Sequence, residues 1–140
     1  MAVSNHQTIV RLLDEEGAAF SNHNPMPIRD HEMASYYRNI NVNATGSMVK
    51  SSTGSLCTIY FMNWASSANH IKIYDKATAA TSADTPVMNF TLYNYQNVAL
   101  TFAKPVEFTN GISIRATTGI ADNNNTNPTT NAVSCSITYI

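Results

Sequence analysis

Apolar and polar residues alternate with a period of two along most of the chain after Ile40. A period of two is typical of β-strands that bury one face, whereas an amphipathic helix repeats every 3.6 residues. The alternation predicts six strands, at residues 56–63, 69–75, 86–93, 97–102, 111–117 and 132–140. Short strands spaced by roughly ten residues and joined by polar turns favour an all-β fold.

The first predicted strand is largely apolar on both faces, which indicates a central position in a sheet. Its alternation places Leu56, Thr58, Tyr60 and Met62 on one face and Cys57, Ile59, Phe61 and Asn63 on the other. The second is predicted to be half-buried, with Ile71 and Ile73 opposite His70, Lys72 and Tyr74. The last three have the predicted inward sets Val98, Leu100 and Phe102; Ile112, Ile114 and Ala116; and Val133, Cys135, Ile137 and Tyr139.

Turn-forming residues separate the predicted strands, and Ser, Thr and Asn together supply 46 of the 140 residues. Asn110-Gly111 is a strong turn signal, because both residues tolerate the left-handed region of backbone space. We therefore predict an all-β fold. It is an antiparallel β-sandwich, jelly-roll-like, at residues 41–140, preceded by an extended N-terminal arm at residues 1–40.

The predicted arm differs in composition from the rest of the chain, since it holds five of the nine carboxylates and three of the four histidines. Residues 8–13 and 18–21 are predicted to form a short hairpin around a turn at 14–17. Pro25 and Pro27 remove two amide donors, so the segment around them is expected to be extended. The arm residues expected to contact a partner or a neighbouring protomer are Ile9, Val10, Leu12, Leu13, Pro25, Met26, Pro27 and Ile28.

The charge pattern narrows the classes of partner. The formal net charge is -1, and the eight basic residues are dispersed along the chain. Nucleic-acid binding is not expected, because it requires a cationic stripe that neutralises phosphates. A membrane-spanning helix is not expected either, because no apolar run approaches the ~20 residues that such a helix needs. The N-terminus does not resemble a secretory signal, so we expect synthesis in the cytoplasm.

Candidate catalytic and metal-binding patterns are weak. Residues 122–127, DNNNTN, place oxygen side chains at alternating positions, as a calcium loop does, but lack its glycine and its final glutamate. The four histidines have no metal-ligand spacing, and no nucleophile motif is present. Two of the carboxylates Asp75, Asp84, Glu107 and Asp122 could still converge as an acid and base pair. We expect no metal, no cofactor and no enzymatic activity.

Cys57 and Cys135 each lie in an alternating run and are expected to be buried thiols. A disulfide between them remains an alternative if their strands are neighbours, although a reducing cytoplasm disfavours it.

Three aromatic residues differ from the others because they lie at strand ends beside turns. Trp64, Tyr93 and Tyr95, together with the Asn-rich loop around Asn124, form a candidate ligand surface. Exposed aromatic side chains at such positions are available to a partner or to a sugar ring. Packing at the edge of the core is the alternative.

The order of several short segments resembles a β-sandwich domain of phage virion proteins, especially those of marine and cyanobacterial phages. Residues 53–63, TGSLCTIYFMN, are followed by 71–78, IKIYDKAT, then by DTPV at 84–87 and a turn at 102–108. NGISIRATTG at 110–119, Ala121-Asp122 and a last strand ending at Tyr139 complete the series. In the arm, LLDEEG at 12–17 and NPMP at 24–27 are also similar to N-terminal segments of such proteins.

This resemblance implies a structural role on the virion and no catalytic residues. The expected function is that of a capsid decoration or cement protein that binds the major capsid protein and stabilises the head. A homotrimer is expected by analogy with such proteins. The alternative is a head-fibre or tail-associated module that binds a carbohydrate or a receptor. The sequence stops at Ile140, before the distal head of longer fibres, which favours the decoration role.

Overall fold

The computed structural model describes residues 34–140, in which it contains eight β-strands and no helix. The strands are β1 (Ser35–Asn39), β2 (Ser47–Lys50), β3 (Gly54–Asn63), β4 (Asn69–Asp75), β5 (Met88–Leu92), β6 (Asn97–Phe108), β7 (Ile112–Thr117) and β8 (Val133–Tyr139). The six predicted strands are confirmed, and β1 and β2 are additional. Within these residues, no helix of a length and apolarity suited to crossing a membrane is present.

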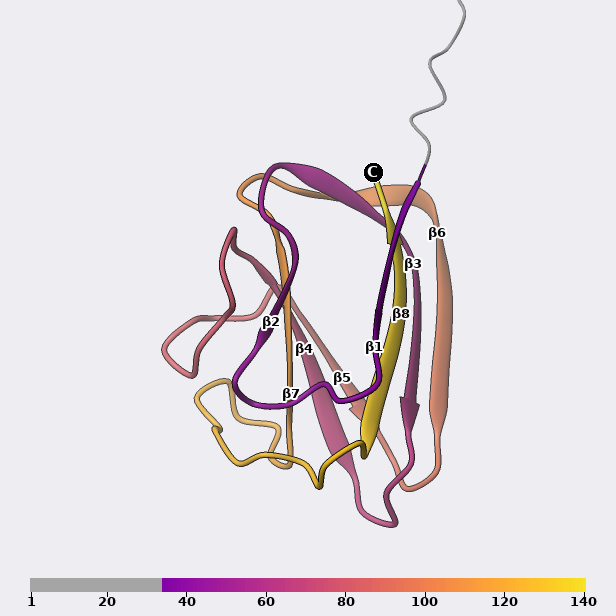
Figure 1. The fold of residues 1–140 in the computed structure, drawn as a ribbon, viewed down its shortest axis with the longest axis vertical. Helices are drawn as coiled ribbons and strands as arrows, with labels where there is room; N and C mark the ends of the chain where they lie inside the picture. Colours follow the sequence, from indigo (N-terminus) through magenta and orange to yellow (C-terminus); the bar gives the residue numbers. More distant parts are fainter. Residues whose placement is uncertain (1–33) are drawn as a thin grey trace, which may run out of the picture. The chain divides into compact units, whose positions relative to one another are not determined.

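The eight strands form two antiparallel four-stranded sheets, which lie as two layers in Figure 1. Sheet I has the order β1-β8-β3-β6, and sheet II has the order β2-β7-β4-β5. The predicted central position of β3 is confirmed, since β3 pairs with both β8 and β6. The described residues are therefore all-β and sandwich-like, as the alternation predicts.

The core lies between the sheets, because both contribute buried side chains to one apolar cluster. Phe61 of sheet I and Phe90 of sheet II meet edge to face, with ring centroids 5.6 Å apart. The predicted inward sets of β7 and β8 are confirmed, and Ile112, Ile114, Val133 and Ile137 are completely buried. Val98 and Leu100 of β6 lie opposite the core residues Phe61 and Ile59, so they share one face as predicted, although Leu100, on an edge strand, is 41% exposed.

The predicted faces of β3 are wrong at Leu56, near the start of the strand. Leu56 is completely buried together with Ile59 and Phe61, so these three share the core side. The register shifts between Leu56 and Thr58, which identifies a bulge at Cys57. One extra residue reverses the side to which every preceding residue points.

The partner strand β6 is irregular at the same level. Thr58 lies opposite Thr101, whereas Leu56 lies opposite Val106, so residues 102–105 face the single residue Cys57. The strand continues through this irregularity to Phe108, and the predicted end at residue 102 is too early. Pro105 is compatible with strand geometry here because β6 is at the edge of sheet I.

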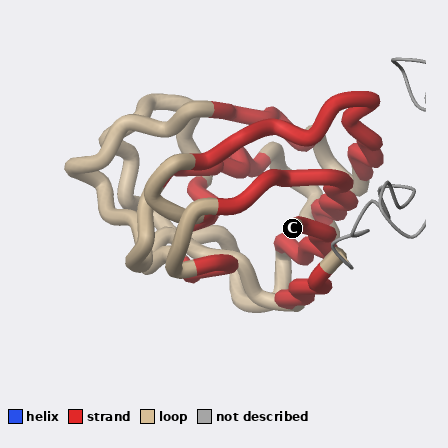
Figure 2. The backbone as a smooth tube through the Cα atoms, turned by 90° about the horizontal axis from the view of Figure 1, so that it is seen from above, coloured by secondary structure: helices blue, strands red, loops and turns tan. Residues whose placement is uncertain are grey.

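The outward side of β4 and β7 is covered, so the prediction that β4 is half-buried is wrong. Lys72, Tyr74 and Arg115 are at most 1% exposed. The segments that connect β4 to β5 and β7 to β8 supply the cover, and Figure 2 shows the connecting segments gathered on one side of the strands. Their backbone carbonyls accept hydrogen bonds from the two buried cations. Arg115 donates to Thr81 and Asn124, and Lys72 donates to Gly119 and Ala121. Arg115 also donates to the carbonyl of Ala44, in the segment between β1 and β2.

The folded domain begins before the predicted boundary at residue 41. Ser35–Asn39 forms strand β1, which pairs along its whole length with β8. The sequence places these residues in the arm because the composition of the first forty residues differs from that of the rest of the chain. The predicted hairpin at 8–21 and the extended segment at Pro25–Ile28 lie outside the described residues.

Candidate binding surface

Within residues 34–140 the outer side of sheet I, unlike that of sheet II, forms an open face. Strand register places its outward side chains in three rows that cross the sheet. The rows are Tyr36, Thr138, Thr58 and Thr101; Arg38, Ser136, Tyr60 and Ala99; and Ser134, Met62 and Asn97. Of these residues only Arg38 carries a charge. We call this surface the sheet I face.

Hydroxyl groups on the sheet I face hold one another and the neighbouring rings in place. The hydroxyl oxygens of Thr58 and Thr138 are 2.6 Å apart, and the Tyr36 hydroxyl donates to Ser136 at 3.2 Å. The indole N–H of Trp64 donates to Ser134 Oγ at 3.0 Å. These bonds fix side chains that would otherwise lose rotamer freedom on binding, so the face is preorganised.

A hollow of about 390 Å³ opens on this face beside Trp64. It is lined by Arg38, Ile40, Tyr60, Trp64, Asn131, Ser134, Cys135 and Ser136. Trp64 and Tyr60 are 58% and 43% exposed, so both rings are accessible from it. A second hollow is lined by residues 64–67 and 129–132, and it shares Trp64 and Asn131 with the first.

Three of the four residues predicted as a ligand surface lie in two adjacent loops. Trp64 follows β3, and Tyr93 and Tyr95 lie in the turn between β5 and β6; all three are exposed. The amide of Tyr95 donates to the carbonyl of Ala65 at 3.1 Å, which joins the two loops. We call this part of the domain the aromatic end.

A buried amide, Asn63, connects the loops of the aromatic end. Its Nδ2 donates to the carbonyls of Ser67, Leu92 and Tyr93 at 2.8, 3.1 and 2.9 Å. Its Oδ1 accepts from the Ala65 amide at 3.1 Å. The positions of Trp64 and Tyr93 therefore depend on one completely buried side chain.

Asn124, the fourth predicted residue, does not line either hollow beside Trp64. Its Oδ1 accepts hydrogen bonds from the amides of Gly119 and Thr126. Asn125 Oδ1 accepts from Arg115, and Asn127 Oδ1 accepts from the Ala44 amide. The side-chain oxygens of three asparagines in the loop are thus engaged in hydrogen bonds that hold the loop, and only Asn124 of these belongs to the alternating set that suggested a calcium loop.

The four carboxylates considered as an acid and base pair include two that are fixed by local donors. Both oxygens of Asp75 accept hydrogen bonds from residues 109–111, while Asp84 accepts from Thr81 and pairs with Lys76 at 2.6 Å. Desolvation acts to raise the pKa of Asp75, but the bonds from Asn110, Thr109 and Gly111 lower it to about 2. For Asp84, the Lys76 hydrogen bond and the Thr81 amide lower the pKa to about 2. Both groups are stably ionised and hold turns.

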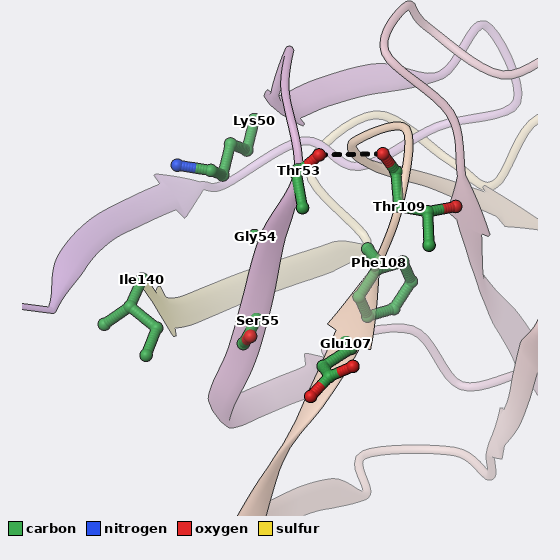
Figure 3. Close-up of a pocket in the computed structure, with 8 residues that line it drawn as sticks. All are labelled: Lys50, Thr53, Gly54, Ser55, Glu107, Phe108, Thr109 and Ile140. Atoms are coloured by element: carbon green, nitrogen blue, oxygen red, sulfur yellow. Dashed lines mark hydrogen bonds between the residues drawn. The ribbon is translucent and has the colours of Figure 1, made fainter.

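Another hollow lies at the end of the domain where β3 begins and β6 ends (Figure 3). Its lining includes Lys50, Glu107, Thr109 and Ile140, and the Thr53 hydroxyl donates to the Thr109 carbonyl at 2.9 Å. Figure 3 shows the Lys50 ammonium and the Glu107 carboxylate pointing away from each other. The ammonium lies 5.6 Å from the ring centroid of Tyr139 instead. Opposite charges are present here but do not converge.

Both cysteines are free thiols. Strands β3 and β8 are neighbours, which is the condition for the disulfide alternative, but Cys135 lies opposite Phe61 and Cys57 lies in the bulge. Cys135 is buried and Cys57 is partly buried. Desolvation raises the pKa of the Cys135 thiol to about 12, against a small opposing effect of a backbone hydrogen bond at Asn39.

Sequence reasoning missed Arg38, Tyr60 and Ser134 as parts of one surface. Arg38 lies in a five-residue strand assigned to the arm, and its neighbour Ser136 on β8 is nearly a hundred positions later in the chain. Among residues 34–140 no group of three or more His, Cys, Asp or Glu side chains could hold a metal ion. Comparison with protein-family models, with curated proteins and with solved structures found no match to this chain.

Proposed function

We propose that the protein is a structural component of a phage virion, a non-enzymatic decoration or cement protein that binds the major capsid protein and stabilises the head. The resemblance of residues 53–63, 71–78 and 110–119 to phage virion domains supports this proposal. The observation that carries it is the position of two features at opposite ends of the folded domain. The chain enters at one end, and the aromatic end lies at the other.

The chain enters sheet I at Ser35, which lies opposite Tyr139, and Tyr139 in turn lies opposite Leu56. The aromatic end is at the other end of the same strands, where Asn63 lies opposite Val133. Figure 1 shows the start of β1 and the C-terminus together at one end of the domain. A domain attached through residues that precede Ser35 would present its aromatic end away from the point of attachment.

We further propose that the two sheets form a jelly roll. In this chain β1 pairs with β8, β2 with β7, β3 with β6 and β4 with β5. These are the pairs that arise when one long hairpin folds over on itself, as in an eight-stranded jelly roll. Jelly rolls are frequent in viral capsid and lectin domains, which supports the virion assignment by analogy of fold.

The mechanism of head stabilisation is linkage. A protein that binds the assembled shell and not its separated subunits stabilises the assembly, and many copies multiply a modest gain per site. We propose that the contacts are made by the extended N-terminal arm. Ile9 to Leu13 would add a strand to an exposed sheet edge, while Pro25 to Ile28 would cross the capsid surface. A homotrimer, in which arms exchange between protomers, is the proposed assembly.

The experiment that tests this proposal is co-sedimentation with capsids that lack the protein. The full chain is expected to bind saturably and to raise the melting temperature of the capsid. A variant without residues 1–33 keeps β1 and is expected to remain folded but not to sediment with capsids. Arg38→Met, a change within the folded domain, is the matched control and should bind like the full chain. Absence of binding by the full chain would contradict the capsid role, and undiminished binding by the truncated chain would contradict the role of the arm.

One observation favours a second candidate, a head-fibre or tail-associated module that binds a carbohydrate or a receptor. The hollow at Trp64 combines accessible aromatic rings with an arginine and two serine hydroxyls. Under this alternative the protein would bind host-surface glycans, and a tail-associated module would not bind isolated capsids.

A further inference from the structure

We propose that the hollow between Arg38, Tyr60 and Trp64 is a binding site for a saccharide that carries a carboxylate group. This inference goes beyond capsid binding and concerns only the folded domain. Arg38 lies on β1, three residues after the chain entry at Ser35, and the hollow extends from it towards Trp64 at the aromatic end.

Strand register brings the three residue types together. Arg38 lies opposite Ser136, and Ser136 lies opposite Tyr60, so Arg38 and Tyr60 flank one small side chain. Neighbouring strands are ~4.8 Å apart, so the backbones of Arg38 and Tyr60 are separated by roughly 10 Å across β8. Ser136 thus forms the floor of an open space between a guanidinium and a phenol ring.

Trp64 closes the hollow from the loop after β3. Its indole N–H is bound to Ser134 Oγ at 3.0 Å, which fixes the ring while leaving the residue 58% exposed. Aromatic faces pack against the apolar C–H faces of sugar rings, and a fixed ring loses little conformational entropy on binding. The Ser134 and Ser136 hydroxyls and Asn131 line the same hollow and offer hydrogen bonds to sugar hydroxyls.

The charge pattern indicates the acidic class of saccharide. Arg38 is exposed and is the one charged residue in the three rows of the sheet I face. Within residues 34–140 the single salt bridge is Lys76–Asp84, so no carboxylate from that part of the chain neutralises Arg38. A planar guanidinium with parallel N–H donors matches a carboxylate in bidentate geometry. Neutral hydroxyls around it leave this as the one strong electrostatic contact.

The test is an NMR titration of the isolated full-length protein labelled with ¹⁵N. Trp64 is the only tryptophan, so its indole N–H gives a single resonance inside the proposed site. The probes are oligosaccharides of glucuronate, galacturonate, mannuronate and N-acetylneuraminate, each paired with a neutral counterpart that lacks the carboxylate. We expect at least one carboxylated probe to shift the Trp64 resonance saturably, and its neutral counterpart to bind at least tenfold more weakly.

Arg38→Met keeps much of the aliphatic stem and removes the charge, and Arg38→Gln provides a polar second replacement. Either variant is expected to weaken binding of the carboxylated probe by about tenfold to a hundredfold, as expected for a hydrogen-bonded charge. Lys104→Met, which removes a cation from β6 outside the hollow, is the matched control and should bind normally. Dispersed spectra of the variants verify that they are folded.

Failure of every carboxylated probe to shift the Trp64 resonance would overturn the proposal. Equal binding of the neutral counterparts, or unchanged affinity in both Arg38 variants, would overturn the assignment to carboxylated saccharides. Because no capsid is present, these outcomes are independent of the co-sedimentation result.

Discussion

Arg115 and Tyr74 are hydrogen bonded to each other, from guanidinium Nη1 to phenol Oη at 3.2 Å, on the side of sheet II that points away from the core. Both side chains are buried, because the loops between β4 and β5 and between β7 and β8 cover them. Arg115 also donates to carbonyl oxygens of three separate segments, at Ala44, Thr81 and Asn124. One cation therefore joins two strands and three connecting segments.

Arg115→Lys is expected to destabilise the domain although it keeps the positive charge. A lysine cannot reach the same acceptors in a fork, and each buried acceptor left without a donor costs about 1–3 kcal/mol. We expect the free energy of unfolding to fall by about 3 kcal/mol, measured by urea denaturation with Trp64 fluorescence. The exposed Arg38→Lys serves as the control and should change stability by less than about 0.5 kcal/mol. A loss no larger than the control's would show that the loops do not depend on this residue.

Asp75 is expected to make stability depend on acid pH. Its folded pKa is about 2 against an ordinary value of 3.8, so the folded state binds this proton less tightly than the unfolded state. The contribution is therefore present above pH 3.8 and is lost as the pH falls towards 2. Asp75→Asn should lower stability at pH 6 and flatten the stability profile between pH 4 and 2. Glu107→Gln, which removes an exposed carboxylate, is the matched control and should change stability at pH 6 by less than about 0.5 kcal/mol.

The parts of this fold that could be predicted from the sequence are those determined by neighbouring residues. Alternation alone identifies six strands and the buried side of β7 and β8. It gives the wrong side for Leu56, because the bulge at Cys57 depends on pairing with β6 and β8, and the strand itself carries no glycine or proline at that position. Periodicity cannot reveal an extra residue that only the partner strands define.

The candidate site and the buried cations depend on contacts between distant parts of the chain. Lys72 and Arg115 alternate with isoleucine and alanine, which is the pattern of a solvent-exposed polar face. Their burial becomes evident only when loops that follow each strand fold back over them. Arg38 and Tyr60 lie on either side of Ser136 on β8, which is nearly a hundred residues after Arg38 in the sequence. Trp64 was predictable as an exposed aromatic residue, whereas its neighbours in the hollow were not.

The two thiols are expected to differ in reactivity towards a thiol reagent in the folded protein. Cys57 is partly buried at the bulge, whereas Cys135 is buried and burial raises its pKa to about 12. Because the thiolate is the reactive form, Cys135 should remain unmodified at pH 8 until the protein unfolds. Quantification with a chromogenic disulfide reagent should give one rapid equivalent in native protein and two in urea. Cys57→Ser should abolish the rapid equivalent, and two rapid equivalents in native wild type would contradict the burial of Cys135.

Asn63→Asp is expected to disrupt the aromatic end selectively, because it changes one donor into an acceptor without changing side-chain size. The amide nitrogen of Asn63 faces the carbonyls of Ser67, Leu92 and Tyr93, so a carboxylate there would meet three oxygens in a completely buried position. Unpartnered buried charges and lost donors are among the few causes of large single-residue effects, and we expect a loss of about 3 kcal/mol or more.

The same substitution should release the loops that hold Trp64 and Tyr93. Under native conditions we expect acrylamide to quench the fluorescence of Trp64 more strongly than in the wild type. The reason is that the Ala65 amide also loses the fixed position of its acceptor, Asn63 Oδ1. Asn123→Asp, a change of the same kind at an exposed loop position, is the matched control and should leave both stability and quenching unchanged. If Asn63→Asp lowered stability but left quenching as in the wild type, Asn63 would support the core and not the position of Trp64.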